Sequence, residues 1–259
     1  MTTGATILAW ALAMACGPTS FVDDLAPDGL EAYDTAPAPP SDPALAVVRR
    51  ALPAWGLSTS EHDPQIAAFL EVHARSWRFW ERIYAVLPAY RAVAADLRAA
   101  QLPELLAAVP DQASRFRPGP DPDCGAGPWR LPVSAPLRVA GCHLRGDPRP
   151  WSSGDPRPVV EGGACRIERC DVDERTDLAA ATAAVLPALA ATHRAVDGDP
   201  RRTLAAHARG DPDAAIAQHL LAACAARQVD PGAFPAIDLG YCDDLAVPSR
   251  RQVTSALAR

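Results

Sequence analysis

Residues 102–116 read LPELLAAVPDQASRF, and this stretch sets the kind of fold that the rest of the chain must complete. Pro103 is tolerated in the first turn of a helix, because the N–H that it lacks would have no partner there. Apolar residues then follow at helical spacing. We therefore expect a helix that begins at Pro103 and runs toward Phe116.

Helical patterns also precede this stretch. Residues 64–87 place large side chains at intervals of three and four residues: Ile66, Phe69, Leu70, Trp77, Trp80, Ile83, Tyr84 and Leu87. Pro88 should interrupt that helix, and a second apolar pattern continues to Ala100. Because the aromatic residues follow one helical stripe, we interpret them as core and not as a ligand platform.

Helical patterns return after residue 176, where Asp177 is a suitable N-cap. The helices expected there cover 178–195, 200–209, 212–227 and 248–259. The sequence shows no alternating strand pattern, no internal repeat and no second transmembrane segment. The expected fold class is therefore mainly α.

The six cysteines beyond residue 100 predict disulfides. They are Cys124, Cys142, Cys165, Cys170, Cys224 and Cys242. An even number in an exported chain favours three disulfides, and every pairing stays open. Metal binding is a weaker alternative, because no second close cysteine pair follows Cys165 and Cys170 and His143 is the only nearby imidazole. Residues 117–171 are dense in Gly, Pro and Cys, which predicts loops and turns pinned by these bonds.

The N-terminus predicts export. Residues 5–15 form an apolar run that is too short to span a bilayer but suits a signal peptide. The run ends at Cys16, and LAMAC at 12–16 looks like a lipobox whose cysteine would be lipidated. The first basic residue is Arg49, which departs from the usual basic start. An ordinary secretory signal, or a wrongly chosen start site, are the alternatives.

Three regions follow from this reading: a signal peptide at 1–16, a tether rich in Pro, Ala and Asp at 17–60, and a domain at 61–259. A helical pattern starts within the tether, around Pro43. The length of 259 residues allows one sizeable domain with such additions. The formal net charge of -6 argues against sequence-independent binding of nucleic acid.

Several short blocks carry a resemblance to a known family. The first is LPELL at 102–106 with PDQASRF at 110–116, and the second is CGAGPWRL at 124–131. The third is DERTD at 173–177, followed by ATAA at 181–184. The fourth joins DGDP at 197–200 to AAHARG at 205–210. In this order they resemble the membrane-bound lytic murein transglycosylases, over roughly residues 64–259.

This resemblance implies the helical fold of soluble lytic transglycosylases and goose-type lysozyme, with the Gly/Pro/Cys-rich region as an insertion. The family cleaves the β-1,4 bond between N-acetylmuramic acid and N-acetylglucosamine and leaves a 1,6-anhydro sugar. One carboxyl does the proton work, and in this chain its position is Ala113. A methyl group cannot act as a general acid.

The other substrate-cleft positions that the resemblance implies are Ser114, Trp129, Arg130 and His207. Arg130 stands for a family glutamine, and His207 with Ala208 stands for the tyrosine and asparagine of the fourth block. The resemblance implies a retained scaffold at Ser114, Phe116, Trp129, Asp173, Arg175 and Thr182. We expect His207 to be a satisfied or solvent-touching histidine, because no Ser or Cys nucleophile is implied beside it. Arg115 and Arg130 would meet carboxylates of the peptide stems.

No nearby acid replaces the missing glutamate. Asp111 lies about 200° around the helix from position 113, and Glu104 lies more than two turns away. Glu161, Glu168 and Glu174 lie in or near the insertion at 145–171, and nothing in their spacing directs them to the cleft. Glu174 matches a family position of its own, so we interpret it as structural.

We therefore expect an exported, lipidated domain of the cell envelope, periplasmic or attached to the outer membrane. It would bind peptidoglycan glycan strands or a cell-wall enzyme without cleaving them, and would need no cofactor or metal. One alternative is an active lytic transglycosylase with a carboxylate relocated to the insertion. Another is a purely structural, disulfide-stapled helical domain that binds no glycan.

Overall fold

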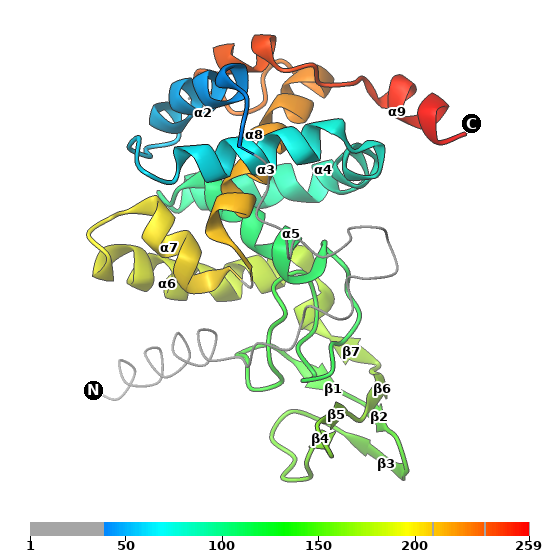
Figure 1. Ribbon diagram of the computed structural model, residues 1–259. Coiled ribbons are helices and arrows are strands. Elements are labelled where there is room, and N and C mark those ends of the chain that lie inside the picture. Colours follow the sequence, from blue (N-terminus) through cyan, green and yellow to red (C-terminus); the bar gives the residue numbers. More distant parts are fainter. Residues whose placement is uncertain (1–38, 209, 236, 259) are drawn as a thin grey trace.

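The computed structural model describes residues 39–208, 210–235 and 237–258 (Figure 1). Within these ranges the protein is mainly helical, as expected. Its α-helices are α2 (Asp42–Ala54), α3 (Asp63–Arg75), α4 (Trp77–Ala99), α5 (Ala108–Ser114), α6 (Leu178–Ala195), α7 (Pro200–His207), α8 (Pro212–Val229) and α9 (Arg250–Leu257). Short 3-10 helices are η2 (Glu104–Ala107), η3 (Glu174–Thr176) and η4 (Gly240–Asp244). The predicted signal peptide, Cys16 and the start of the tether lie outside the described residues.

Helix α8 lies at the centre of the helical body. Every residue from Ala215 to Ala226 is buried, and most of them are alanine or leucine. The helix packs against α3, α4, α5 and α7. Small side chains on all its faces let these neighbours approach closely, so the alanine-rich composition is used in the core.

Helix α2 corrects the predicted extent of the tether. Its buried face consists of Ala44, Val47, Val48, Ala51 and Leu52, and all five belong to the main hydrophobic core. Ser41 caps the helix by accepting a hydrogen bond from the N–H of Ala44. The region assigned to a tether at 17–60 therefore contributes residues 42–54 to the domain. The helical pattern seen around Pro43 is therefore confirmed, but the helix packs into the domain and is not part of a tether.

Pro88 does not interrupt its helix, contrary to the prediction. Helix α4 passes through Pro88, and α6 likewise passes through Pro187. Buried residues lie on both sides of each proline, so packing along the whole helix outweighs the lost backbone hydrogen bond. The expected helix at 64–87 instead ends at Ser76, whose side chain caps α4 through the N–H of Phe79.

Several helix starts predicted from sequence are confirmed. Asp177 accepts a hydrogen bond from the N–H of Ala180 at the start of α6. Asp199 and Asp211 cap α7 and α8 in the same way, each before a proline in the first turn. Pro103 lies just before η2, so the helix expected from Pro103 begins as a 3-10 turn and becomes α-helical only at Ala108.

The segment between α5 and α6 forms a separate small β-rich part at one end of the molecule (Figure 1). Its strands are β1 (Val139–Ala140), β2 (Cys142–Leu144), β3 (Asp147–Trp151), β4 (Val160–Glu161), β5 (Ala164–Cys165), β6 (Ile167–Arg169) and β7 (Val172–Asp173). They pair antiparallel as β1–β7, β3–β2–β6 and β4–β5. The sequence analysis expected loops here, because strands of two to five residues are too short to show an alternating pattern.

Three disulfides staple this fold, as the cysteine count predicted. Cys124–Cys165 and Cys142–Cys170 lie within the β-rich part, and Cys224–Cys242 joins α8 to η4. Three disulfides indicate an oxidising, exported environment. In the part of the chain that the structure describes, no helix has both the length and the apolarity to cross a membrane.

Candidate functional site

The expected site surrounds Ala113, near the end of α5. Ala113 is only 5% exposed, so its methyl group belongs to the protein interior. The helix ends one residue later, and both Arg115 and Phe116 adopt the left-handed conformation, with φ of 53° and 57°. Left-handed residues other than glycine are costly and tend to persist where the surrounding structure imposes them.

Ser114 joins the end of α5 to the segment before Trp129. Its Oγ lies 3.0 Å from the carbonyl oxygen of Pro110 and 2.8 Å from that of Pro128. The side chain is buried and its hydroxyl is used within the chain. Ser114 therefore connects two blocks of the resemblance, and it does not present its hydroxyl to a ligand.

Trp129 makes the next connection. Its Nε1–H donates to Thr182 Oγ1 on α6 over 3.0 Å, and Thr182 donates to the carbonyl of Leu178 over 2.7 Å. Both side chains are buried. The tryptophan thus fixes the segment after α5 against α6.

Arg130 lies against the backbone near Ala113. Its Nε–H donates to the carbonyl oxygen of Ala113 over 3.3 Å, and its guanidinium also donates to the carbonyl of Gly119. The structure therefore brings positions 113 and 130 together. The arginine holds the chain around the site, since its guanidinium is bound to these carbonyls.

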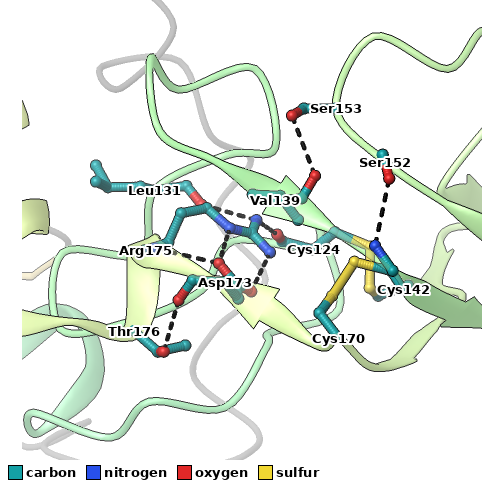
Figure 2. The surroundings of a disulfide bond; sticks show 12 residues. Cys124, Leu131, Val139, Cys142, Ser152, Ser153, Cys170, Asp173, Arg175 and Thr176 are labelled. Carbon is teal, nitrogen blue, oxygen red and sulfur yellow. Dashed lines mark hydrogen bonds and ion pairs between the residues drawn. A yellow bond between two sulfur atoms is a disulfide. The ribbon is translucent and has the colours of Figure 1, made fainter.

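Arg175 joins the second block to the third inside the β-rich part (Figure 2). Its side chain is 0% exposed and makes a two-pronged ion pair with Asp173, with the closest nitrogen and oxygen 2.7 Å apart. The remaining guanidinium nitrogen donates to the carbonyls of Cys124 and Leu131 over 2.7 and 3.2 Å. Gly127 must be glycine, because a Cβ there would lie 1.6 Å from the carbonyl oxygen of Arg175.

His207 lies between α7 and α6. Its Nε2 is 2.9 Å from Thr192 Oγ1, and among the described residues its buried Nδ1 has no hydrogen-bond partner. Burial lowers the pKa of this histidine, so the ring is neutral at pH 7. Thr192 therefore satisfies one of the two ring nitrogens of His207, and the other stays unpaired among the described residues.

The acidic residues weighed as replacements are held elsewhere. Asp111 is buried, pairs with Arg82 over 2.6 Å and accepts from Gln218 on α8. In the β-rich part, Glu161 and Glu168 pair with arginines over 3.1 and 3.7 Å. Glu174 accepts from the N–H of Arg138 over 2.8 Å, which fits its structural interpretation.

Two pockets lie away from Ala113. One, of about 380 Å³, includes Ser60, His62, Asp199 and Arg201 in its lining. The other, of about 480 Å³, lies between α4, η2 and the loop after α8, and we call it the Glu104 pocket. Its lining residues are Pro88, Arg91, Ala92, Ala94, Ala95, Arg98, Glu104, Gly232, Ala233, Phe234 and Pro235.

The Glu104 pocket could not be predicted from the sequence. From sequence, Glu104 comes into question only as a substitute for the missing glutamate, and its position on the helix excludes that role. The lining comes from three segments of the chain, with residues near 90, 104 and 233, and nothing in the sequence links them. A charged residue inside the apolar run LPELL was the one available signal.

No protein-family model matches the chain, and neither a curated protein nor a solved structure matches it. The lysozyme-like fold and the family therefore stay predictions that rest on the short blocks and their contacts.

Proposed function

We propose that this chain is an exported domain derived from a lytic murein transglycosylase, which binds peptidoglycan strands without cleaving them. The observation that carries this proposal is the buried methyl group of Ala113 at the position where the resemblance implies the acid. Glycan cleavage needs a titratable proton within hydrogen-bond reach of the leaving oxygen. Ala113 has none to give.

The contacts between the blocks support the family origin. Ser114 lies beside Pro128, Trp129 donates to Thr182, and Arg175 donates to Cys124. Each contact joins one block to another over many residues of chain. Residues retained for scaffold reasons would make such contacts, whether or not the cleft still works.

The alternative of an active enzyme needs a carboxylate from the insertion. Glu161 and Glu168 are largely exposed, at 70% and 54%, and each lies beside an arginine of the same small β-rich part. A general acid must lie beside the leaving oxygen with its proton available, whereas both of these carboxylates are held in ion pairs on the surface of the β-rich part. We therefore favour binding without cleavage.

Anchoring is part of the same proposal. Lipidation of Cys16 would attach the domain to a membrane facing the cell wall, in the periplasm or at the outer membrane. The three disulfides agree with such a compartment.

Co-sedimentation with purified sacculi tests the binding. We expect the protein to pellet with sacculi in a saturable way and to be released by soluble peptidoglycan fragments. Reduced and unfolded protein serves as the control for nonspecific adsorption. Protein that stays in the supernatant would contradict the proposal and favour a purely structural helical domain.

A further inference from the structure

We propose that the Glu104 pocket binds an amino-acid-type ligand, namely an α-carboxylate with an N–H donor on the adjacent carbon. A free amino acid and the C-terminal residue of a short peptide share this chemistry. The pocket is separate from the surroundings of Ala113. The inference goes beyond peptidoglycan binding and does not depend on it.

The lining of the pocket combines three charged residues with small and apolar ones. Arg91 and Arg98 lie on the same face of α4, about two turns or roughly 10 Å apart. Arg91 is already paired with Asp230. Apart from Arg91, Arg98 and Glu104, the lining consists of four alanines, a glycine, Phe234 and two prolines, so the pocket suits a small aliphatic group.

Arg98 is the group that would bind the ligand's carboxylate. Its side chain is 40% exposed, and its one ion pair among the described residues is a long contact of 3.4 Å with Glu104 Oε1. A guanidinium has five N–H donors arranged to grip a carboxylate with two parallel hydrogen bonds. Most of these donors are therefore free for a ligand.

Glu104 is the group that would receive the ligand's N–H. It is only 8% exposed, and its Oε2 is buried without a hydrogen-bond partner in the described part of the chain. Burial raises the pKa of this carboxyl, and the Arg98 guanidinium opposes part of that effect. A buried acceptor left unpaired is costly, so a rotation of this side chain that brings Oε2 to a ligand's N–H would relieve the penalty.

The pairing of these two groups selects the ligand class. A ligand with only an anion would approach Arg98 but leave Glu104 unsatisfied and repelled. A ligand with only a cation would do the reverse. An α-carboxylate with an adjacent N–H serves both side chains. Its carboxylate and its nitrogen are attached to the same carbon, so they lie close together, as Arg98 and Glu104 do. A volume of about 480 Å³ admits a single residue or a short peptide.

Isothermal titration calorimetry with alanyl-alanine tests this proposal on the whole protein. Two matched probes remove one group each: the methyl ester of the dipeptide lacks the carboxylate, and alanyl-lactate replaces the N–H with oxygen. We expect saturable binding of alanyl-alanine, and affinities weaker by about tenfold or more for both analogues. These probes report on the wild-type protein, whatever the variants do.

Variants assign the binding to the pocket. We expect Arg98→Met and Glu104→Leu to weaken dipeptide binding by about tenfold or more. Arg251→Met on α9 and Asp96→Leu on α4 are matched controls outside the pocket and should bind like wild type. Circular dichroism establishes that each variant is folded.

Two outcomes would overturn the proposal. One is the absence of saturable binding at about 10 mM dipeptide. The other is equal binding of the dipeptide by wild type, Arg98→Met and Glu104→Leu.

A further arm of the experiment compares a muropeptide with the free dipeptide. Tighter binding of the muropeptide assigns the ligand to cell-wall stem peptides, and equal or weaker binding assigns it to free peptides. Either result of that arm supports the pocket.

Discussion

At the scale of single residues, the polar groups expected in a substrate cleft are used to hold the protein together. Ser114 and Trp129 are buried and bonded to other segments, and Arg130 binds the carbonyl of Ala113. The alanine at position 113 could be read directly from sequence. The inward direction of the neighbouring groups could not, because a motif names residues without saying which way they point.

Arg175 should be among the costliest side chains to lose. Replacing it by methionine removes the ion pair of Asp173 and the guanidinium hydrogen bonds to the carbonyls of Cys124 and Leu131, in a largely buried place. We expect Arg175→Met to lower the free energy of unfolding by about 3–5 kcal/mol, as measured by chemical denaturation.

The control for this loss is Arg145→Met, which removes an exposed arginine whose ion pair with Glu168 spans 3.7 Å. That change should stay within about 0.5 kcal/mol of wild type. Equal effects of the two substitutions would show that the Arg175 contacts contribute no more to the free energy of unfolding than an exposed ion pair does.

At the scale of elements, capping residues were the most reliable guide to structure and prolines the least. Asp177 and Asp199 marked helix starts correctly, because an N-cap acts through the few residues beside it. Pro88 failed as a predicted break, because burial along α4 outweighs one lost hydrogen bond. Such burial depends on distant segments and cannot be read locally.

The β-rich part depends on its disulfides more than the helices do. Its own buried cluster contains only six residues: Cys124, Val139, Cys142, Leu144, Trp151 and Ile167. A core of this size contributes little, so cross-links must supply the stability that packing does not.

Removing Cys142–Cys170 by a double serine substitution should therefore open this part first. We expect rapid cleavage between residues 145 and 164 in limited proteolysis, with far-UV circular dichroism of the helices unchanged. The bridge closes 28 residues, which corresponds to about 3.5 kcal/mol in the chain-entropy model.

The matched variant replaces Cys224 and Cys242, whose bridge closes 18 residues and should be worth about 3 kcal/mol. It should leave the 145–164 segment resistant to protease. Cleavage at the same rate in both double variants would show that the β-rich part has no separate stability.

At the scale of the whole molecule, the sequence predicted the fold class, the three disulfides and most helices. It did not predict that α2 belongs to the core, nor the small sheets, nor the Glu104 pocket. Each of these depends on contacts between segments far apart in the chain. Local patterns predict elements, and the arrangement of those elements decides which residues share a site.

The centre of the molecule also makes stability depend on pH. His219 on α8 is 1% exposed, and burial lowers its pKa to about 3. Its Nδ1 lies 2.5 Å from the hydroxyl oxygen of Tyr90, and its Nε2 has no hydrogen-bond partner among the described residues. The ring is therefore neutral in the folded protein.

The unfolded chain binds the proton that folded His219 refuses, because an unfolded histidine has a pKa near 6.5. Stability is thus fully present above about pH 6.5 and is lost as pH falls toward the folded value. From pH 6.5 to 5 this residue should cost about 2 kcal/mol. Chemical denaturation at the two pH values should show a smaller decrease for His219→Asn than for wild type; equal decreases would rule out this role.

The central claim is that the domain keeps a transglycosylase-like scaffold and binds the cell wall without cutting it. The most direct test incubates the wild-type protein with purified sacculi and analyses the soluble products by mass spectrometry. The account predicts that the protein is retained on the sacculi and that no 1,6-anhydro-muropeptides appear beyond a protein-free control. Release of 1,6-anhydro-muropeptides would contradict it, and would mean that a carboxylate other than one at position 113 performs the cleavage.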